Sequence, residues 1–159
     1  QRQMCIRDSG HGGVRICGMP IRNDFLPEIR AKVGLVFQDP DDQLFCPTVF
    51  EDVAFGPMNM GFSKEEVFGR VARALAQVSL EDCRDRSAFH LSGGEKKRVA
   101  LATVLALDPE ILVLDEPSAN IDPRHRRRLL NWLKTFPRTL VIATHDLDFA
   151  LEVCDRCVL

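Results

Sequence analysis

The fold of this chain is decided by the stretch Ile111-Leu-Val-Leu-Asp-Glu-Pro117. Its first four residues are apolar, and a short apolar run of this kind is typical of a strand that is buried on both faces of a sheet. Two carboxylates, Asp115 and Glu116, follow the run directly. Open parallel α/β sheets bind their ligands at the carboxyl ends of their strands. The stretch therefore predicts an α/β fold with a candidate site at this end of the strand.

Two further runs have the same character, Val33–Phe37 and Thr139–Ala143. Each is followed by polar residues, Gln38 after the first run and His145 shortly after the second. Helical patterns lie between the runs, and the alternation of strand and helix predicts a mostly parallel sheet flanked by helices. The last residues, Arg156–Leu159, are expected to begin one more strand.

The helix starts are marked by capping residues. Ser63 with Glu66, and Ser92 with Glu95, have the spacing of capping boxes. Asp122 precedes a proline at a first helical position, and Asp146 is a second candidate for a single N-cap. The helices that these caps open are expected over residues 64–80, 93–106, 123–133 and 147–151.

One long segment, Asp39–Pro57, is rich in Asp, Pro and Phe and has no clear helical period. We expect an ordered loop with short helical turns there. Loops of this length without secondary structure of their own tend to be functional. The segment is therefore expected to be functional.

Composition excludes several classes of protein. The 159 residues suffice for one domain of ordinary size, and 45% apolar with 28% charged residues is typical of globular chains. The net charge of -2 offers no general attraction to nucleic acid or anionic lipid. No apolar run approaches the ~20 residues of a membrane-spanning helix. The chain has six scattered cysteines, of which only Cys154 and Cys157 form a close pair, and it has no apolar signal peptide. This favours a reducing cytosolic setting.

The polar residues at the expected strand ends suit metal-assisted attack of water on a phosphate. Asp115 would hold Mg²⁺, and Gln38 would contact the metal ion or the water. Glu116 would orient and deprotonate the water, and His145 would contact the transferred phosphoryl group. Each of these residues taken alone is more often structural than catalytic. Their occurrence together at strand ends favours a site.

With these residues the sequence resembles a known family, the ATP-binding-cassette (ABC) ATPases. Leu91-Ser-Gly-Gly-Glu95 resembles the signature motif, and Ile111–Glu116 is similar to a Walker B strand at the usual distance from it. Ser118–Asp122 resembles the D-loop, Gln38 the Q-loop glutamine and His145 the switch histidine. The resemblance extends from about residue 14 to residue 159.

The resemblance implies a P-loop NTPase-like domain with a helical signature subdomain at about residues 57–92. In this family two domains enclose two ATP molecules, and each signature contacts the ATP that the opposite subunit holds. The implied contacts to ATP come from Ser92, Gly93, Gly94 and Glu95. Glycines in a first helical turn cost ~1 kcal/mol each relative to alanine, which indicates close approach of a ligand to the backbone.

The same resemblance implies roles at the dimer interface and at the metal ion. Ser118 and Asp122 would lie at the dimer interface as D-loop residues. Asp115 and Gln38 would hold Mg²⁺, and Glu116, His145 and Gln38 would form the catalytic set. The implied cofactors are thus ATP and Mg²⁺, and the implied partner is a second ATPase subunit in a homodimer or heterodimer.

Three stretches are more specific within the family: Val33–Phe45, Glu51–Pro57 and Phe89–Arg98. They are similar to the ATPase subunit of cobalt, nickel and vitamin importers of the energy-coupling-factor type. The similarity implies a peripheral position on the cytoplasmic face of the cell membrane, with residues 38–57 docked on a transmembrane coupling subunit. It implies no nucleic-acid partner, and the transported substrate would be recognised by other subunits.

The family's phosphate-binding Walker A motif, G-x-x-x-x-G-K-[ST], does not occur in the sequence. The glycine cluster Gly10-His-Gly-Gly13 lacks the lysine and the hydroxyl residue. We therefore expect residues 10–159 to be an incomplete ABC nucleotide-binding domain, preceded by a non-native or unstructured leader over residues 1–9. ATP hydrolysis is then expected of the full-length protein and not of this piece alone.

Two alternatives stay open. The first is a soluble ABC-type ATPase that acts on DNA or ribosomes, which the basic run Arg124–Arg128 supports. Such a run is more often a solvated helix face. The second is a non-catalytic remnant that lost its Walker A motif, although Gln38, Glu116, His145 and the signature are all present.

Overall fold

The computed structural model describes residues 13–158, which belong to two compact units, one up to Ala31 and one from Lys32. In the first unit, strands β1 (Arg15–Ile16) and β2 (Met19–Pro20) form an antiparallel hairpin. It is followed by the short helix η2 (Asn23–Phe25) and by α1 (Leu26–Lys32), which leads into the second unit. The leader expected over residues 1–9 lies outside the described residues.

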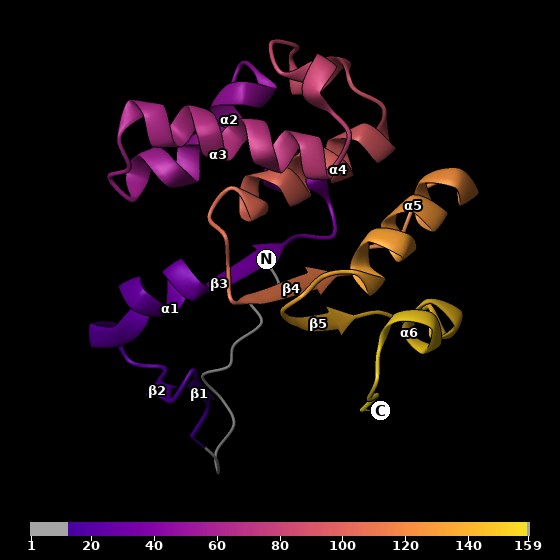
Figure 1. Cartoon of the computed structure of the whole chain (residues 1–159). Helices are drawn as coiled ribbons and strands as arrows, with labels where there is room; N and C mark the ends of the chain where they lie inside the picture. Colours follow the sequence, from indigo (N-terminus) through magenta and orange to yellow (C-terminus); the bar gives the residue numbers. More distant parts are fainter. Residues whose placement is uncertain (1–12, 159) are drawn as a thin grey trace. The chain divides into compact units, whose positions relative to one another are not determined.

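The second unit contains the predicted parallel sheet. Its strands β3 (Val33–Val36), β4 (Ile111–Asp115) and β5 (Thr139–Ala143) have the order β3-β4-β5, and both pairs are parallel (Figure 1). Val36 pairs with Leu114, and Leu114 pairs with Ile142. This register brings the carboxyl ends of all three strands to one edge. The prediction of an α/β fold with a parallel sheet is confirmed.

The strand expected at the end of the chain is not formed by its described residues. Residues 156–158 adopt no strand and pair with none of the three strands of the second unit. Val158 is 95% exposed, so its side chain is not packed into the core as that of a buried strand would be. The prediction is therefore wrong for these residues.

Residues 39–57 are not a loop throughout, because α2 occupies Val49–Asn59. The helix begins at a capping box in which Thr48 and Glu51 satisfy each other's backbone N–H groups. Val49, Val53 and Pro57 recur at four-residue intervals and are buried. The prediction of a loop is wrong over this half of the segment, and only the short helix η3 (Pro40–Asp42) matches the expected turns.

The other helices follow the predicted caps. Both capping boxes are formed, at the starts of α3 (Lys64–Gln77) and α4 (Gly93–Leu105). Asp122 caps α5 (Pro123–Lys134), and Asp146 caps α6 (Leu147–Val153). Two short helices, η4 (Glu81–Cys83) and η5 (Ala88–His90), connect α3 to α4.

Helices α2, α3 and α4 pack together as a helical layer, and α4 also packs on β3 (Figure 1). The contact between α4 and β3 is close at Gly34, where a Cβ atom would lie 2.0 Å from Cγ1 of Val104. Leu112, Leu130 and Phe149 are completely buried and extend the core from β4 to α5 and α6. Among residues 13–158, no helix has the length and apolar character that crossing a membrane requires.

Candidate active site

The candidate site lies where the three parallel strands end. Gln38, Glu116 and His145 follow β3, β4 and β5 at this edge of the sheet. The backbone N–H of Glu116 donates to the carbonyl oxygen of Ala143 at 2.8 Å, which extends the pairing of β4 with β5 past the last strand residue. The sheet thus brings the loops that carry Glu116 and His145 into direct contact.

The Glu116 carboxylate is held by the loop that follows β5. Its Oε1 accepts the backbone N–H of His145 at 3.0 Å and lies 2.7 Å from the ring Nδ1 of His145. Its Oε2 accepts the hydroxyl of Thr144 at 3.1 Å. The His145 side chain is 83% exposed and that of Glu116 only 18%, so the imidazole covers the carboxylate from the solvent side. The structure therefore brings together two of the predicted catalytic residues.

The contact changes the pKa of both groups. Burial raises the pKa of Glu116, but the hydrogen bonds from His145 and Thr144 outweigh it and leave the pKa below its ordinary value. The hydrogen bond to Glu116, followed by the carboxylate charge, raises the pKa of His145. At neutral pH Glu116 is ionised and can accept a proton, which is what a general base requires.

Asp115 and Gln38 lie at the strand ends but are not hydrogen-bonded to this pair. Asp115 ends β4 with its side chain half-buried, and Gln38 is exposed. Over residues 13–158, no group of three or more His, Cys, Asp and Glu side chains is arranged as ligands of a metal ion. The structure thus provides one carboxylate and one amide whose oxygen atoms could bind a cation. These two side chains alone do not complete its coordination shell.

The backbone around Gln38 is fixed by a neighbouring glutamine. Oε1 of Gln43 accepts the backbone N–H of Phe37 at 3.1 Å. Its amide nitrogen donates to the carbonyl of Ala100 and to the hydroxyl of Thr103, both at 2.8 Å. Gln43 therefore ties the segment that follows β3 to the middle of α4.

The signature residues form the start of α4. Ser92 donates to Glu95 Oε2 from its N–H at 2.8 Å and from its hydroxyl at 2.7 Å, and these bonds lower the pKa of Glu95. A Cβ on Gly93 would have no atom within 4 Å, whereas one on Gly94 would lie 3.2 Å from the His125 ring. The close packing of His125 therefore explains why residue 94 is a glycine. Of the two glycines, only Gly93 has an open backbone surface.

The predicted D-loop residues make contacts within their own chain. The hydroxyl of Ser118 donates to Asp146 Oδ2 at 3.0 Å, and the same carboxylate receives the Arg126 guanidinium at 3.1 Å. Asp122 accepts the backbone N–H groups of the first turn of α5 and the ring nitrogen of His125, and the bond from His125 lowers its pKa to about 2. Ser118 thus joins the loop after β4 to the residue next to His145.

Three residues of the site were not predicted. Thr144 binds Glu116, and its place directly before His145 is a signal that could have indicated it. Arg126 binds Asp146, and Lys97 of α4 donates to the carbonyl of Glu116 at 3.4 Å and to that of Ala119. These three contacts of the lysine and the arginine join residues about 20 positions apart, so local sequence carries no signal for them.

Comparisons of the sequence with known families and with known proteins point to the same family. The ABC transporter family matches residues 5–119. A putative ABC transporter ATP-binding protein of Geobacter sulfurreducens is 53% identical over 92% of the chain, which covers 59% of that protein. The energy-coupling factor transporter ATP-binding protein EcfA of Carboxydothermus hydrogenoformans is 51% identical over 94% of the chain, with 57% of its own length covered. The chain spans less than two thirds of these curated relatives.

Solved structures agree with the sequence comparisons. The structure of cbiO1 from Clostridium perfringens, described as part of the ABC transporter complex cbiONQ, superposes with a TM-score of 0.84 at 38% identity. That match covers 93% of the chain and 62% of cbiO1. A dimeric ATP-binding cassette in a post-hydrolysis state with ADP and Pi has a TM-score of 0.77 at 29% identity, covering 91% of the chain and 67% of the cassette.

Proposed function

Because this chain belongs to the ABC transporter family, we propose that it is part of the ATP-hydrolysing subunit of an importer of the energy-coupling-factor type. Such a subunit powers the transport of a cobalt or nickel ion or of a vitamin. The observation that carries the proposal is the Glu116 carboxylate, held by Thr144 and His145 at the carboxyl end of a parallel sheet. The likeness to EcfA and cbiO1 supports the importer type.

Glu116 is the proposed general base. An ionised carboxylate oxygen accepts about two hydrogen bonds. Both acceptor positions of Oε1 are taken by His145, whereas Oε2 has one partner, Thr144. The remaining position on Oε2 is where the attacking water would be oriented and would lose its proton. The His145 ring is exposed at the same place, and with Nδ1 on Glu116 its second nitrogen, Nε2, would contact the transferred phosphoryl group.

The residues present fit Mg²⁺ because the donor set is built from oxygen atoms. Carboxylate and amide oxygens are ligands that Mg²⁺ prefers, and it commonly binds through one or two carboxylates together with phosphate oxygens and water. Asp115 and Gln38, whose side chains have no hydrogen-bond partners within the described part of the chain, would hold it. When bound, the ion would neutralise charge on the phosphate oxygens.

The start of α4 is the proposed contact to ATP in the partner subunit. The N–H groups of a first helical turn and the helix dipole favour an anion. A Cβ on Gly93 would have no atom within 4 Å, so the backbone is open to a phosphate there. The Ser92 hydroxyl lies beside it and would exchange its bond to Glu95 for one to the phosphate. This geometry supports a second ATPase subunit as partner, with Ser118 and Asp122 near the interface.

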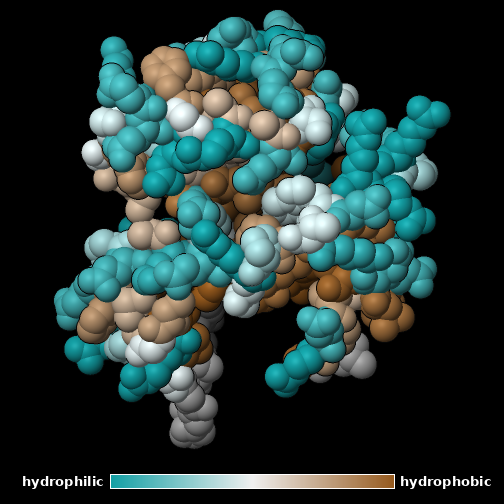
Figure 2. Space-filling model, in the orientation of Figure 1, coloured by the Kyte–Doolittle hydropathy of each residue, from teal (hydrophilic) through white to brown (hydrophobic). Residues whose placement is uncertain are grey.

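The helical layer offers the surface for a transmembrane subunit. Phe45 and Phe55 stack edge to face with ring centroids 4.9 Å apart, although they are 62% and 47% exposed. Met58, on the same helix as Phe55, is 64% exposed. Figure 2 shows apolar side chains at the surface of this layer among hydrophilic ones. An exposed aromatic pair of this kind supports docking of residues 38–57 on an apolar partner segment.

The rival role on DNA or ribosomes loses its main support in the structure. Arg126 binds Asp146 at 3.1 Å and lies 3.9 Å from Glu152, and Arg127 lies 3.5 Å from Glu152. Two arginines of the basic run are therefore paired with carboxylates within the second unit, where they share Glu152 with Lys134. The remaining arginines, 124 and 128, are too few for a basic surface.

The test uses the full-length protein assembled with its partner subunits. Glu116→Gln should lower ATP turnover by about 10²–10⁴-fold and leave ATP affinity largely intact, because the amide keeps the shape but cannot accept the proton. Glu65→Gln, an exposed carboxylate on α3, is the matched control and should keep wild-type turnover. Wild-type turnover in Glu116→Gln would refute the assignment of the base. Uptake of cobalt, nickel and a vitamin by vesicles that contain the complex would identify the substrate class.

A further inference from the structure

Lys97 connects the helix of the signature residues to the loop that carries Glu116. It lies on α4, one turn after Gly93 and Gly94. Its ammonium group donates to the carbonyl oxygens of Glu116, at 3.4 Å, and of Ala119. Both acceptors belong to the turn between β4 and α5, in which the N–H of Ala119 donates to the carbonyl of Glu116 at 3.1 Å.

The turn that Lys97 holds has an unfavourable backbone conformation. Glu116 has φ 45° and Asn120 has φ 56°, so two residues with side chains adopt the left-handed region. Such residues persist only where the surrounding structure holds them, and they are frequent at active sites. The Glu116 carboxylate contacts Thr144 and His145 with its backbone in this conformation, so a change in the turn would move the carboxylate.

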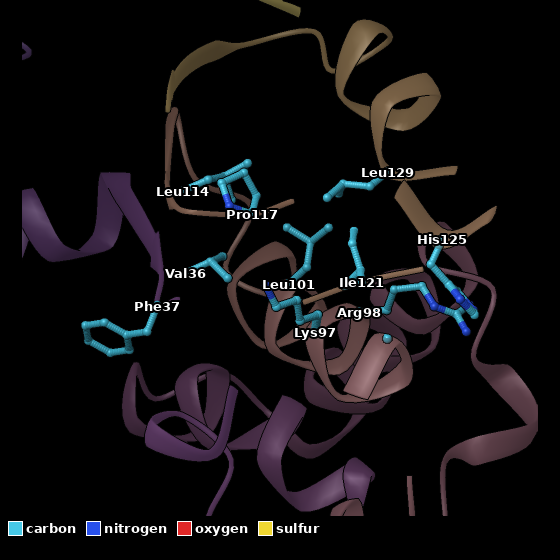
Figure 3. Close-up of a pocket in the computed structure, with 11 residues that line it drawn as sticks. Val36, Phe37, Lys97, Arg98, Leu101, Leu114, Pro117, Ile121, His125 and Leu129 are labelled. Atoms are coloured by element: carbon cyan, nitrogen blue, oxygen red, sulfur yellow. The ribbon is translucent and has the colours of Figure 1, made fainter. Parts of the chain in front are cut away.

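The ammonium group of Lys97 reaches the turn through an apolar environment. The side chain lines a cavity of about 40 Å³ together with Leu101 of the same helix and Leu114, Pro117 and Ile121 of β4 and the following loop (Figure 3). Burial lowers the pKa of Lys97, which means that its ammonium group has lost part of its water shell. Hydrogen bonds from a partly desolvated cation to carbonyl groups are strong compared with those at the surface.

We propose that Lys97 is a positioning residue for Glu116: it fixes the left-handed turn from α4, so that the carboxylate stays aligned for its role as base. The inference rests on the proposed function of Glu116. It assigns to α4 a second role besides its N-terminal signature, because the same helix sets the geometry of the catalytic carboxylate in its own chain.

The first test compares variants of the full-length protein in its complex. Lys97→Met keeps the volume and the apolar contacts but removes the donors, and should lower kcat by about 10–100-fold while the KM for ATP changes by less than about twofold. Lys97→Arg keeps the charge and the donors, and the adjacent cavity leaves room for its larger head group. It should restore kcat to within about threefold of wild type. Lys134→Met, which removes an exposed lysine paired with Glu152, is the matched control and should leave both constants unchanged.

The second test needs no ATP hydrolysis. Amide hydrogen exchange over residues 116–121 should become faster in Lys97→Met and stay at the wild-type rate in Lys97→Arg and Lys134→Met. Lys97→Gln, which retains a shorter donor, serves if Lys97→Met does not fold, and should show the same effects at smaller size. Unchanged exchange, or a rise in KM that matches the loss of kcat, would overturn the inference. If Glu116→Gln keeps full turnover, the proposed function fails, and the exchange rates still decide whether Lys97 holds the turn.

Discussion

Replacing Gly34 by alanine should separate α4 from β3 and destabilise the protein. The added Cβ would lie 2.0 Å from Cγ1 of Val104, and 3.1 and 3.3 Å from Cγ and Cβ of Pro109. Carbon atoms in contact prefer about 3.5–4.0 Å, so the Val104 contact requires a movement of about 1.5–2 Å. Overpacking of a core typically costs about 1–3 kcal/mol, and a clash with a β-branched side chain on a rigid helix belongs at the upper end.

A loss of about 3 kcal/mol corresponds to a fall in Tm of about 6–12 °C for a domain of 150–250 residues. Thermal unfolding of the full-length protein, followed by circular dichroism, measures it. The double variant Gly34→Ala with Val104→Ala removes the clashing methyl groups and should recover much of the lost stability. Gly69→Ala is the matched control, because a Cβ there would meet only the end of Arg73 at 3.9 Å. It should stabilise α3 by about 0.5–1 kcal/mol.

The reasoning fails if Gly34→Ala unfolds within about 1 °C of wild type. It also fails if Val104→Ala destabilises the Gly34→Ala protein as much as it destabilises the wild type, because the two changes would then be independent. A result of either kind would mean that α4 and β3 yield to each other at little cost. The alignment of the signature helix with the strand ends would then need another explanation.

Two further predictions concern titration and a buried carboxylate. The pKa of His145 lies above its ordinary 6.5, so the favourable charge interaction with Glu116 is present at lower pH and is lost as the pH rises through the raised pKa. NMR titration of the imidazole should therefore show a midpoint above 6.5 that returns toward 6.5 in Glu116→Gln, and an unchanged midpoint would contradict the contact. Asp52, which is 3% exposed, accepts the backbone N–H groups of Phe45 and Cys46 at 3.0 and 2.9 Å. Asp52→Ala should cost about 2–4 kcal/mol in denaturant unfolding and Asp52→Asn, which keeps the acceptor, clearly less; equal losses would show that these bonds are not the cause.

The fold was predictable where local signals are strong. The capping boxes at Ser63 and Ser92 and the apolar runs of all three parallel strands give elements that agree with the structure within a few residues. Helix α2 was missed because Gly56 and Pro57 lower its helical propensity, and because its apolar residues are spread around the helix and hide the helical period. Its capping pair, Thr48 and Glu51, is visible in the sequence and outweighs those features.

The sequence indicated which residues belong to the site but not which of them touch each other. The residues at strand ends indicate which side chains share an edge, because parallel strands align their carboxyl ends. Which of them touch depends on loop geometry: the loop after β5 brings Thr144 and His145 onto Glu116, but the side chains of Gln38 and Asp115 make no hydrogen bond to the pair. Gly94 was interpreted only as a ligand contact, and its packing on His125 is a tertiary effect that a one-dimensional pattern does not contain.

The hydrogen bonds of Gln43 have a mechanical consequence for Gln38. Because Gln43 returns to the backbone of Phe37, the intervening residues form a ring that one hydrogen bond closes. The same side chain is anchored to Ala100 and Thr103, so the ring has a fixed pivot on α4. The residues around Gln38 are thus cross-linked to the helix that Ser92 caps, and we expect a displacement of this segment to move that helix with it.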